Sequence, residues 1–489
     1  MVAGSLMAAI LWWRLMTSAP GAVQSGIRDV EEDAAYLKGL AQGFDPEKFI
    51  DLKKGVFMGL DSQRKPIYLP RATLDKNHCE ILGESGVGKS SLAGVLLSQL
   101  AASGEAVIVF DPKPDEKLPG VLARMGEKHG FPLVVIDLRH TANFPQINPF
   151  FGCRPDQVEE LLQVALELGK TGDAGVDFYR GGDREATSWI ADAVAGDPAR
   201  SMQDIITAAS DDEAVIEKEN LWRELRQLGR VKAFATRQQG IDLPALLEDA
   251  GGVVLYVMGS TTKLEIGAAQ KLLLQRVLQV LEGRRDKSKP VCLFLDELKY
   301  LLSPAALRAA GTVRDRNAHL MFAHQSQGDL DDCPGLSPKA VRGAIWGNSG
   351  IKFAYKMLDS ATALELSRLA GASRADVQTR SASENDNGGS TNTSWTHASR
   401  EFMPPHVFSH LPKPSGGEAS VGVVFGLGTA FYLSTRWLAA GETPQPLRIE
   451  KPADQANAAP ISHAAESVQE TAEAQAEQAS ADSLDDLLK

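Results

Sequence analysis

A stretch of eight residues near the start of the chain has the spacing of a phosphate-binding loop. Residues 83–90 read Gly-Glu-Ser-Gly-Val-Gly-Lys-Ser and fit the pattern G-x-x-x-x-G-K-[ST]. The glycines allow backbone N–H groups to converge on phosphates, and the N-terminus of the helix that follows adds partial positive charge. Lys89 would reach the outer phosphates, and Ser90 would offer its hydroxyl to Mg²⁺. The sequence therefore predicts a site for ATP and Mg²⁺ formed by Gly83, Glu84, Ser85, Gly86, Val87, Gly88, Lys89, Ser90 and Ser91.

A second motif places two adjacent carboxylates at the end of an apolar run. Residues 291–295 (Val-Cys-Leu-Phe-Leu) predict a buried strand, and Asp296 and Glu297 follow it. Beside a phosphate loop, Asp296 would hold Mg²⁺ through water and Glu297 would polarise the attacking water. The alternative is a strand followed by a solvated acidic turn. The phosphate loop in the same domain favours the hydrolytic interpretation.

Two further groups are candidates for contact with the outer phosphate. Residues 320–323 predict another buried strand, and Gln325 comes shortly after it, where its amide could contact the γ-phosphate or its water. Arg314 and Arg316 lie on the segment that precedes this strand. An arginine there could neutralise charge on the ATP of a neighbouring subunit, and a solvated loop arginine is the equally weighted alternative.

Strands and helices must alternate along the chain to bring these groups together. Apolar runs without polar alternation indicate strands buried on both faces, as in a parallel sheet covered by helices. We therefore predict an α/β fold with a mostly parallel sheet. Strands are expected at 79–82, 106–110, 133–137, 252–258, 291–295 and 320–323, with hairpins at 55–70 and 420–434.

Residues 152–246 break this alternation and predict an all-α insertion. Four segments in this range have helical periodicity, and Trp189 and Trp222 are expected to be core residues rather than nucleic-acid platforms. A helix is also predicted at 28–38, ended by Gly39. Residues 381–399 are rich in Gly, Ser and Asn and predict a loop.

Composition excludes several classes of protein. The chain has 489 residues and is 43% hydrophobic, which is ordinary for a globular protein of two or three domains. Its four cysteines show no C-x-x-C spacing, so neither a disulfide framework nor a zinc site is expected, and a reducing compartment fits best. The net charge of −12 argues against a uniformly basic nucleic-acid binder, although much of it lies in an acidic tail after residue 453.

The N-terminus has a short apolar segment. Residues 2–13 are apolar and end in two tryptophans and an arginine, like the last turns of a membrane helix. A helix of about a dozen residues is about 18 Å long, which is short of the roughly 30 Å hydrocarbon core. A remnant of a membrane anchor and a merely apolar leader are equally compatible with this segment.

The order of these motifs resembles that of the type IV coupling proteins (TraG/TraD-like P-loop ATPases). The resemblance covers about residues 50–440, and the all-α insertion is its most discriminating feature. The same order occurs more loosely in septal and archaeal DNA translocases, which share a RecA-like core. The residues that carry the resemblance are 83–90, Asp111-Pro112-Lys113, Ile147-Asn148-Pro149-Phe150, Leu295-Asp296-Glu297, His324-Gln325-Ser326 and the segments 402–404 and 411–412.

The resemblance implies an ATP-driven motor that hands single-stranded DNA and its relaxase to a type IV secretion channel. It implies a ring of six, with ATP between subunits and Arg314 as the preferred finger, at the cytoplasmic face of the bacterial inner membrane or in the cytoplasm. Here Lys113 is followed by Pro-Asp where the family often has a glycine and an acid. The expected parts are 1–50 (leader and connector), 51–151 and 247–440 (nucleotide-binding domain), 152–246 (all-α insertion) and 441–489 (disordered acidic tail).

Two alternatives stay open from the sequence. The same motor could serve as a DNA translocase without a secretion channel. A nucleotide-dependent adaptor that has lost hydrolysis is the other possibility, although all the hydrolytic side chains are present. A transporter ATPase is disfavoured because Ser415-Gly416-Gly417-Glu418 follows the Asp-Glu strand instead of preceding it, and a GTPase switch because no N-K-x-D element is found.

Overall fold

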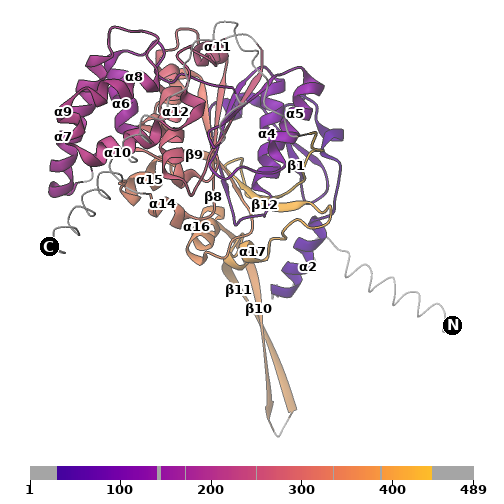
Figure 1. The fold of residues 1–489 in the computed structure, drawn as a ribbon. Helices are drawn as coiled ribbons and strands as arrows, with labels where there is room; N and C mark the ends of the chain where they lie inside the picture. The colour runs from indigo at the N-terminus through magenta and orange to yellow at the C-terminus, as the bar shows by residue number, and fades with distance from the viewer. Residues whose placement is uncertain are drawn as a thin grey trace, which may run out of the picture. The chain divides into compact units, whose positions relative to one another are not determined.

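The described residues of the computed structural model (30–139, 145–170, 172–248, 251–333, 335–385 and 388–442) are organised around a large central sheet (Figure 1). They all lie in one unit of the chain, which ends at Leu447. The sheet has 11 strands in the order β2-β1-β13-β12-β9-β3-β8-β7-β4-β6-β5. Neighbouring strands from β9 to β5 are parallel. This confirms the predicted α/β class with a mostly parallel sheet.

The parallel strands correspond to the apolar runs of the sequence. They are β3 (His78–Leu82), β4 (Ala106–Asp111), β5 (Leu133–Asp137), β6 (Val253–Met258), β7 (Val291–Leu295), β8 (Ala318–His324) and β9 (Ser349–Ala354). The sequence did not predict β9. The two hairpins at the other end are antiparallel, as predicted, and consist of β1 (Val56–Leu60), β2 (Pro66–Leu69), β12 (Ser420–Phe425) and β13 (Phe431–Thr435).

Both faces of the parallel sheet are buried. Along β4, Ile108 and Phe110 pack into one core cluster, whereas Val107 and Val109 pack into the other. This division explains why β4 is apolar at every position before Asp111. In Figure 1 helices α4 (Lys89–Ala102) and α5 (Leu118–His129) lie on one side of the sheet, and α12 (Leu264–Gly283) lies on the other.

Residues 155–248 are helical apart from their connections. The helices are α6 (Pro155–Ala165), α7 (Ala174–Ala193), α8 (Met202–Ser210), α9 (Glu213–Ile216), α10 (Glu219–Leu228), η2 (Lys232–Phe234) and α11 (Leu243–Glu248). The chain enters and leaves this segment at one place, because Asn148 donates its N–H to Gln239 O (3.1 Å) and Ile241 donates its N–H to Gln146 O (3.0 Å). The helical segment is thus attached to the core at a single place, between β5 and β6, and interrupts no strand of the sheet. The domain boundaries 152 and 246 stay a prediction.

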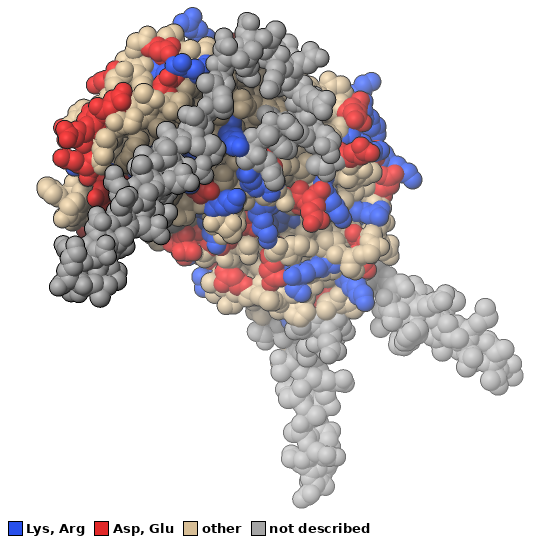
Figure 2. Space-filling view, in the orientation of Figure 1, with Lys and Arg blue, Asp and Glu red and all other residues tan. Residues whose placement is uncertain are grey.

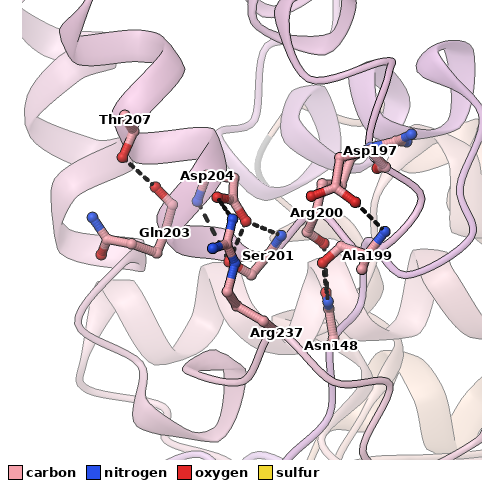
Figure 3. Close-up of polar contacts among 9 residues, drawn as sticks. All are labelled: Asn148, Asp197, Ala199, Arg200, Ser201, Gln203, Asp204, Thr207 and Arg237. Carbon is pink, nitrogen blue, oxygen red and sulfur yellow. Dashed lines mark hydrogen bonds and ion pairs between the residues drawn. The ribbon is translucent and has the colours of Figure 1, made fainter. Parts of the chain in front are cut away.

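Asn148 joins the core to the helical segment (Figure 3). Its side-chain Nδ2 donates to the carbonyl oxygen of Arg200 at 2.9 Å, and its Oδ1 accepts from Phe150 N at 3.1 Å. Arg200 is itself buried, and its guanidinium donates to the carbonyl oxygens of Asp197 (2.7 Å) and Ala195 (3.0 Å) after α7. The Asn-Pro motif of the sequence thus has a structural use at the entrance to the insertion.

The prediction of a loop at 381–399 is wrong. β10 (Ala372–Asn385) and β11 (Gly388–Glu401) pair in antiparallel register from Ala372 opposite Glu401 to Asn385 opposite Gly388. Figure 1 shows this ribbon extending away from the sheet below α17 (Pro405–His410). A polar composition indicates that a segment has little apolar surface to bury, but it does not prevent backbone pairing between two strands.

Two smaller expectations also need correction. Helix α2 (Val30–Leu40) continues through Gly39, where a glycine in a helix interior costs only about 1 kcal/mol. Trp189 is not a fully buried core residue, since 37% of its surface is exposed, whereas Trp222 packs against the core as expected.

The remaining elements connect the strands. They are η1 (Pro46–Phe49), α3 (Arg71–Asp75), η3 (Leu298–Tyr300), α13 (Pro304–Ala309), η4 (Val313–Arg316), α14 (Gln327–Asp331), α15 (Pro338–Ala344) and α16 (Ser360–Ala370). Among the described residues, no helix combines the length and apolar character that crossing a membrane requires. The apolar segment 2–13 and the acidic tail lie outside the described residues, so those two predictions are untested.

His78, at the start of β3, is expected to make the fold sensitive to acid. Its Nε2 lies 2.8 Å from Ala310 O, and its Nδ1 accepts from Leu320 N at 3.0 Å. Burial lowers the pKa of His78 to about 4, from 6.5 in the unfolded chain. Between pH 6.5 and 4 the unfolded state therefore binds the proton first, and stability present above pH 6.5 falls by up to about 3 kcal/mol.

The measurement is the denaturant midpoint of wild type and His78→Gln from pH 7 to 4.5. Glutamine lacks the titrating group, so we expect its stability to fall less steeply with acid than that of wild type. Equal slopes for the two proteins would show that His78 is protonated in the folded state as readily as in the unfolded state.

Candidate functional site

The phosphate-type loop lies between β3 and α4, as its pattern predicts. Gly83, Gly86 and Gly88 have φ angles of +144°, +75° and +107°, which favour glycine. A Cβ atom at Gly88 would lie 1.9 Å from Ser420 Oγ on β12. The motif therefore needs glycine at Gly88 both for backbone conformation and for the close approach of a neighbouring strand.

Lys89 is folded back onto the loop that precedes it. Its Nζ donates to Gly83 O at 2.6 Å and to Glu84 O at 3.0 Å, and only 8% of its surface is exposed. Burial lowers its pKa, while the carboxylates of Asp296 and Glu297 act in the opposite direction. The amine therefore lies within the electrostatic field of both predicted acids.

Asp296 and Glu297 follow β7 at the carboxyl edge of the sheet. Asp296 N donates to Phe110 O of β4 at 3.0 Å, so the β4–β7 pairing continues to this residue. Burial raises the pKa of Asp296, and the nearby Asp111 carboxylate adds to the effect. Glu297 has a φ of 42° and is mostly buried. A non-glycine residue in this conformation costs about 1–2 kcal/mol, a strain that often marks functional sites.

Lys89, Ser90, Asp296 and Glu297 border one cleft of about 540 Å³. Its size falls in the usual range for small-molecule sites. The loop after β4 contributes Lys113–Lys117 to the lining, and Pro414 and Trp437 complete it. The structure thus brings together the phosphate loop and both acids, which the sequence motifs required.

Asp111 organises the wall of this cleft. Its two carboxylate oxygens accept from Lys113 N (3.0 Å) and Asp115 N (2.9 Å), which fixes the loop that follows β4. The hydroxyl of the buried Tyr256 on β6 also donates to it. Burial raises the pKa of Asp111. The sequence placed Asp111 at this edge but gave no signal for Tyr256, beyond a tyrosine in an otherwise aliphatic strand whose hydroxyl needs a partner.

Not every predicted site residue lines the cleft. Val87 packs into the core, Ser91 is buried, and Glu84 forms an ion pair with Lys413 (2.7 Å). Gln325 follows β8 beside the loop, since Gly83 N donates to His324 O at 3.3 Å, but it is not among the cleft-lining residues. Its role at the γ-phosphate stays a prediction.

Arg314 and Arg316 lie at the opposite edge of the sheet. Both belong to η4, which directly precedes the amino end of β8. A strand of seven residues spans about 23 Å, so neither arginine is near the cleft of its own chain. This placement argues against a role at the ATP of the same chain, and both a role in a neighbouring subunit and a solvated loop arginine stay open.

Beside the loop lies a buried charge network that the sequence motifs did not indicate. Glu80 on β3 accepts from Lys352 Nζ of β9 at 2.5 Å, and its other oxygen lies 2.8 Å from His324 Nε2 of β8. Burial alone would raise the pKa of Glu80, but the hydrogen bonds and charges of its two partners outweigh burial and lower it. The network joins the three strands that surround the phosphate loop.

Comparison with known proteins gives matches to both halves of the core. Residues 290–413 match the family model for the TraM recognition site of TraD and TraG, and residues 56–115 match the model for the central domain of helicase HerA. Mobilization protein A of Escherichia coli is 28% identical over 307 residues, which are 62% of this chain and 56% of that protein. The chain thus spans little more than half of this relative.

Over residues 290–413 the chain is therefore similar to TraD and TraG. Solved structures agree with this chain in fold. The plasmid coupling protein TrwB in complex with ADP and Mg²⁺ has a TM-score of 0.55 at 15% identity, over 83% of this chain and 95% of that one. VirB4 of Thermoanaerobacter pseudethanolicus has a TM-score of 0.50 at 16% identity, over 80% and 98%. These likenesses confirm the RecA-like P-loop fold.

The residues that line the cleft are of the types that hold a nucleotide and a magnesium ion. Gly86 and Gly88 of the loop line it, together with an ammonium, a hydroxyl and two carboxylates. Hydroxyl and carboxylate oxygens are the ligands that Mg²⁺ prefers. Binding of ADP and Mg²⁺ is stated for TrwB, and the residues present here are of the types that such binding requires.

Proposed function

We propose that this chain is an ATP-hydrolysing motor that moves single-stranded DNA, with its relaxase, toward a type IV secretion channel. The observation that carries the proposal is that Lys89, Asp296 and Glu297 line one cleft. The match to the TraM recognition site of TraD and TraG supports the conjugative role and a partner among the DNA-processing proteins.

In this proposal each residue at the cleft has a separate role in ATP hydrolysis. Lys89 would leave the loop carbonyls to neutralise charge on the outer phosphates, and Ser90 and Asp296 would hold Mg²⁺, which supplies further charge neutralisation when bound. Glu297 would orient the attacking water and accept its proton. Gln325, beside the loop, would respond to the γ-phosphate.

A ring of six chains would place Arg314 of one chain at the ATP of the next. Arg314 lies at the sheet edge away from the cleft of its own chain, so it could contact ATP only in a neighbouring chain. Figure 2 shows acidic and basic side chains interspersed over one face of the described residues, without a uniformly basic surface there. Contact with DNA would therefore depend on local groups of Lys and Arg. In this proposal the ring works at the cytoplasmic side of the inner membrane.

A DNA translocase without a secretion channel is the second candidate. The match of residues 56–115 to the central domain of helicase HerA favours it. Both candidates use the same cleft, so they differ in partners rather than in chemistry. Co-purification of a relaxase with the full chain supports the coupling role, and DNA-dependent movement without such a partner supports the translocase.

The first test is whether single-stranded DNA stimulates phosphate release. A motor couples hydrolysis to its track, so we expect on the order of tenfold stimulation, equivalent to about 1.4 kcal/mol of activation free energy. Lys89→Ala is the control and should show no activity with or without DNA. An unchanged rate in the presence of DNA would instead indicate a nucleotide-dependent adaptor.

A further inference from the structure

Three buried side chains with metal-binding atoms converge at the amino end of the central strands. Glu105 directly precedes β4, Cys292 lies on β7 and His319 lies on β8. Cys292 is the register partner of both Val107 and His319, and Glu105 is two residues before Val107, so all three point to the same face. Their ligand atoms all lie within 4.8 Å of one another.

The cluster contains polar atoms whose bonding is unsatisfied. Glu105 and Cys292 are 0% exposed and His319 is 1% exposed. Glu105 Oε1 and His319 Nε2 have no hydrogen-bond partner, although the two atoms are 3.2 Å apart. Two ligands bound tetrahedrally to one ion at about 2.0 Å are separated by about 3.3 Å. The spacing therefore suits two ligands of a shared ion.

We propose that Glu105, Cys292 and His319 bind one Zn²⁺ ion. A thiolate, an imidazole and a carboxylate are the three ligand types that Zn²⁺ takes in proteins, whereas Mg²⁺ and Ca²⁺ take oxygen. The three side chains are closed to solvent, so an ion bound there would have no access to a substrate and would be structural. The fourth position of its tetrahedron needs a ligand besides these three. It lies at the sheet edge opposite the nucleotide cleft, so it is independent of the proposed hydrolytic chemistry.

The surroundings of the cluster complete it in geometry and charge. Arg71 Nη2 donates to Glu105 Oε2 at 2.7 Å, which orients the carboxylate and leaves Oε1 directed at His319. Hydrogen-bonded carboxylates of this kind commonly support metal ligands. Asp75 lies 3.7 Å from Arg71 Nε. With Zn²⁺, a thiolate, two carboxylates and one guanidinium the formal charge is zero, so no net charge is buried.

Burial disfavours charge on all three side chains while the cluster holds no cation. It lowers the pKa of His319 to about 3, raises the pKa of Glu105 to about 8 and raises the pKa of the Cys292 thiol as well. Zinc would therefore have to displace the protons of the thiol and the carboxyl when it binds. A neutral acid beside a neutral imidazole is the metal-free alternative, and the experiment below separates it from zinc binding.

A zinc ion here would link three central strands. β4, β7 and β8 carry Asp111, Asp296 and Gln325 at or just after their carboxyl ends, whereas the cluster lies at their amino ends. Joining the strands at one edge would hold their relative register, and thereby the relative positions of these three residues at the other edge. The ion is thus a structural element that supports the cleft without touching it.

The test is metal analysis of the full chain, purified from medium supplemented with zinc. We expect about one zinc per chain, and refolding with Co²⁺ should give a thiolate-to-cobalt charge-transfer band, because Cys292 supplies sulfur. Zinc should also raise the melting temperature relative to protein refolded without metal. Protein without bound metal, or with metal that has no sulfur ligand, would overturn the proposal and support the neutral acid–imidazole pair.

Variants assign the ligands. Cys292→Ser should lose the stoichiometric zinc and the cobalt band, whereas Cys79→Ser is the matched control. Cys79 is also fully buried, lies on β3 in the same core cluster, and is not one of the three ligands. If Cys292→Ser does not fold, X-ray absorption of the wild-type zinc protein decides the question by showing whether sulfur is bound. Retention of the cobalt band in Cys292→Ser would refute the assignment.

Discussion

Replacing Glu297 with glutamine should slow ATP turnover about 10²–10⁴-fold while nucleotide binding is kept. Glutamine has the same shape but cannot accept a proton from the attacking water. Glu297 borders the cleft with Lys89, and its backbone has a left-handed φ of 42°. Glutamine has no better access to that conformation than glutamate, so the backbone strain should persist. The measurement is steady-state phosphate release together with the affinity for a fluorescent ATP analogue.

Glu116→Gln is the matched control for this change. Glu116 lines the same cleft and loses the same charge, but it belongs to the loop after β4 and not to the pair of acids that follows β7. We expect its turnover to stay within about twofold of wild type, because a charge at the cleft wall has no role in proton transfer. If both variants were equally slow, the loss would follow from the electrostatic field of the cleft rather than from a general base at Glu297.

The central sheet could be predicted because its signal is local. Each of β4, β5 and β7 is a short run of apolar residues that ends at or before an acid, and such runs are recognisable without knowledge of their neighbours. The loop 83–90 was equally recognisable, since glycines at fixed spacing with Lys89 and Ser90 have few other uses. The order of motifs then placed Asp296 and Glu297 beside it, which the cleft confirms.

The features that the sequence did not predict depend on contacts between residues that are far apart in the chain. No local pattern shows that Tyr256 donates to Asp111, because the two lie on different strands. The ribbon formed by β10 and β11 was missed because backbone pairing requires no apolar side chains. The absence of C-x-x-C spacing led us to expect no zinc site, and the proposed Glu105–Cys292–His319 site would contradict that expectation. Sheet register, rather than spacing along the chain, brought these three residues together.

Glu80 shows the same limitation and leads to the largest expected change in stability. A glutamate within an apolar strand is costly unless it is paired, and its partner Lys352 is 272 residues away in the chain. Lys352 is also buried, and it donates to Trp346 O at 2.7 Å. Removing one member of a buried pair leaves an uncompensated charge, which typically costs about 3–5 kcal/mol.

Lys352→Met should therefore lower the free energy of unfolding by about 3–5 kcal/mol, measured by chemical denaturation at pH 7. Glu80→Gln combined with Lys352→Met is the control, since glutamine removes the orphaned charge and can still bond His324. We expect the double variant to be more stable than Lys352→Met alone, so the two changes should be strongly non-additive. Because Gly83 follows β3 directly, the single variant should also bind nucleotide more weakly. Additive effects, or a single variant as stable as wild type, would mean that Glu80 is held as a neutral acid and that Lys352 contributes only packing.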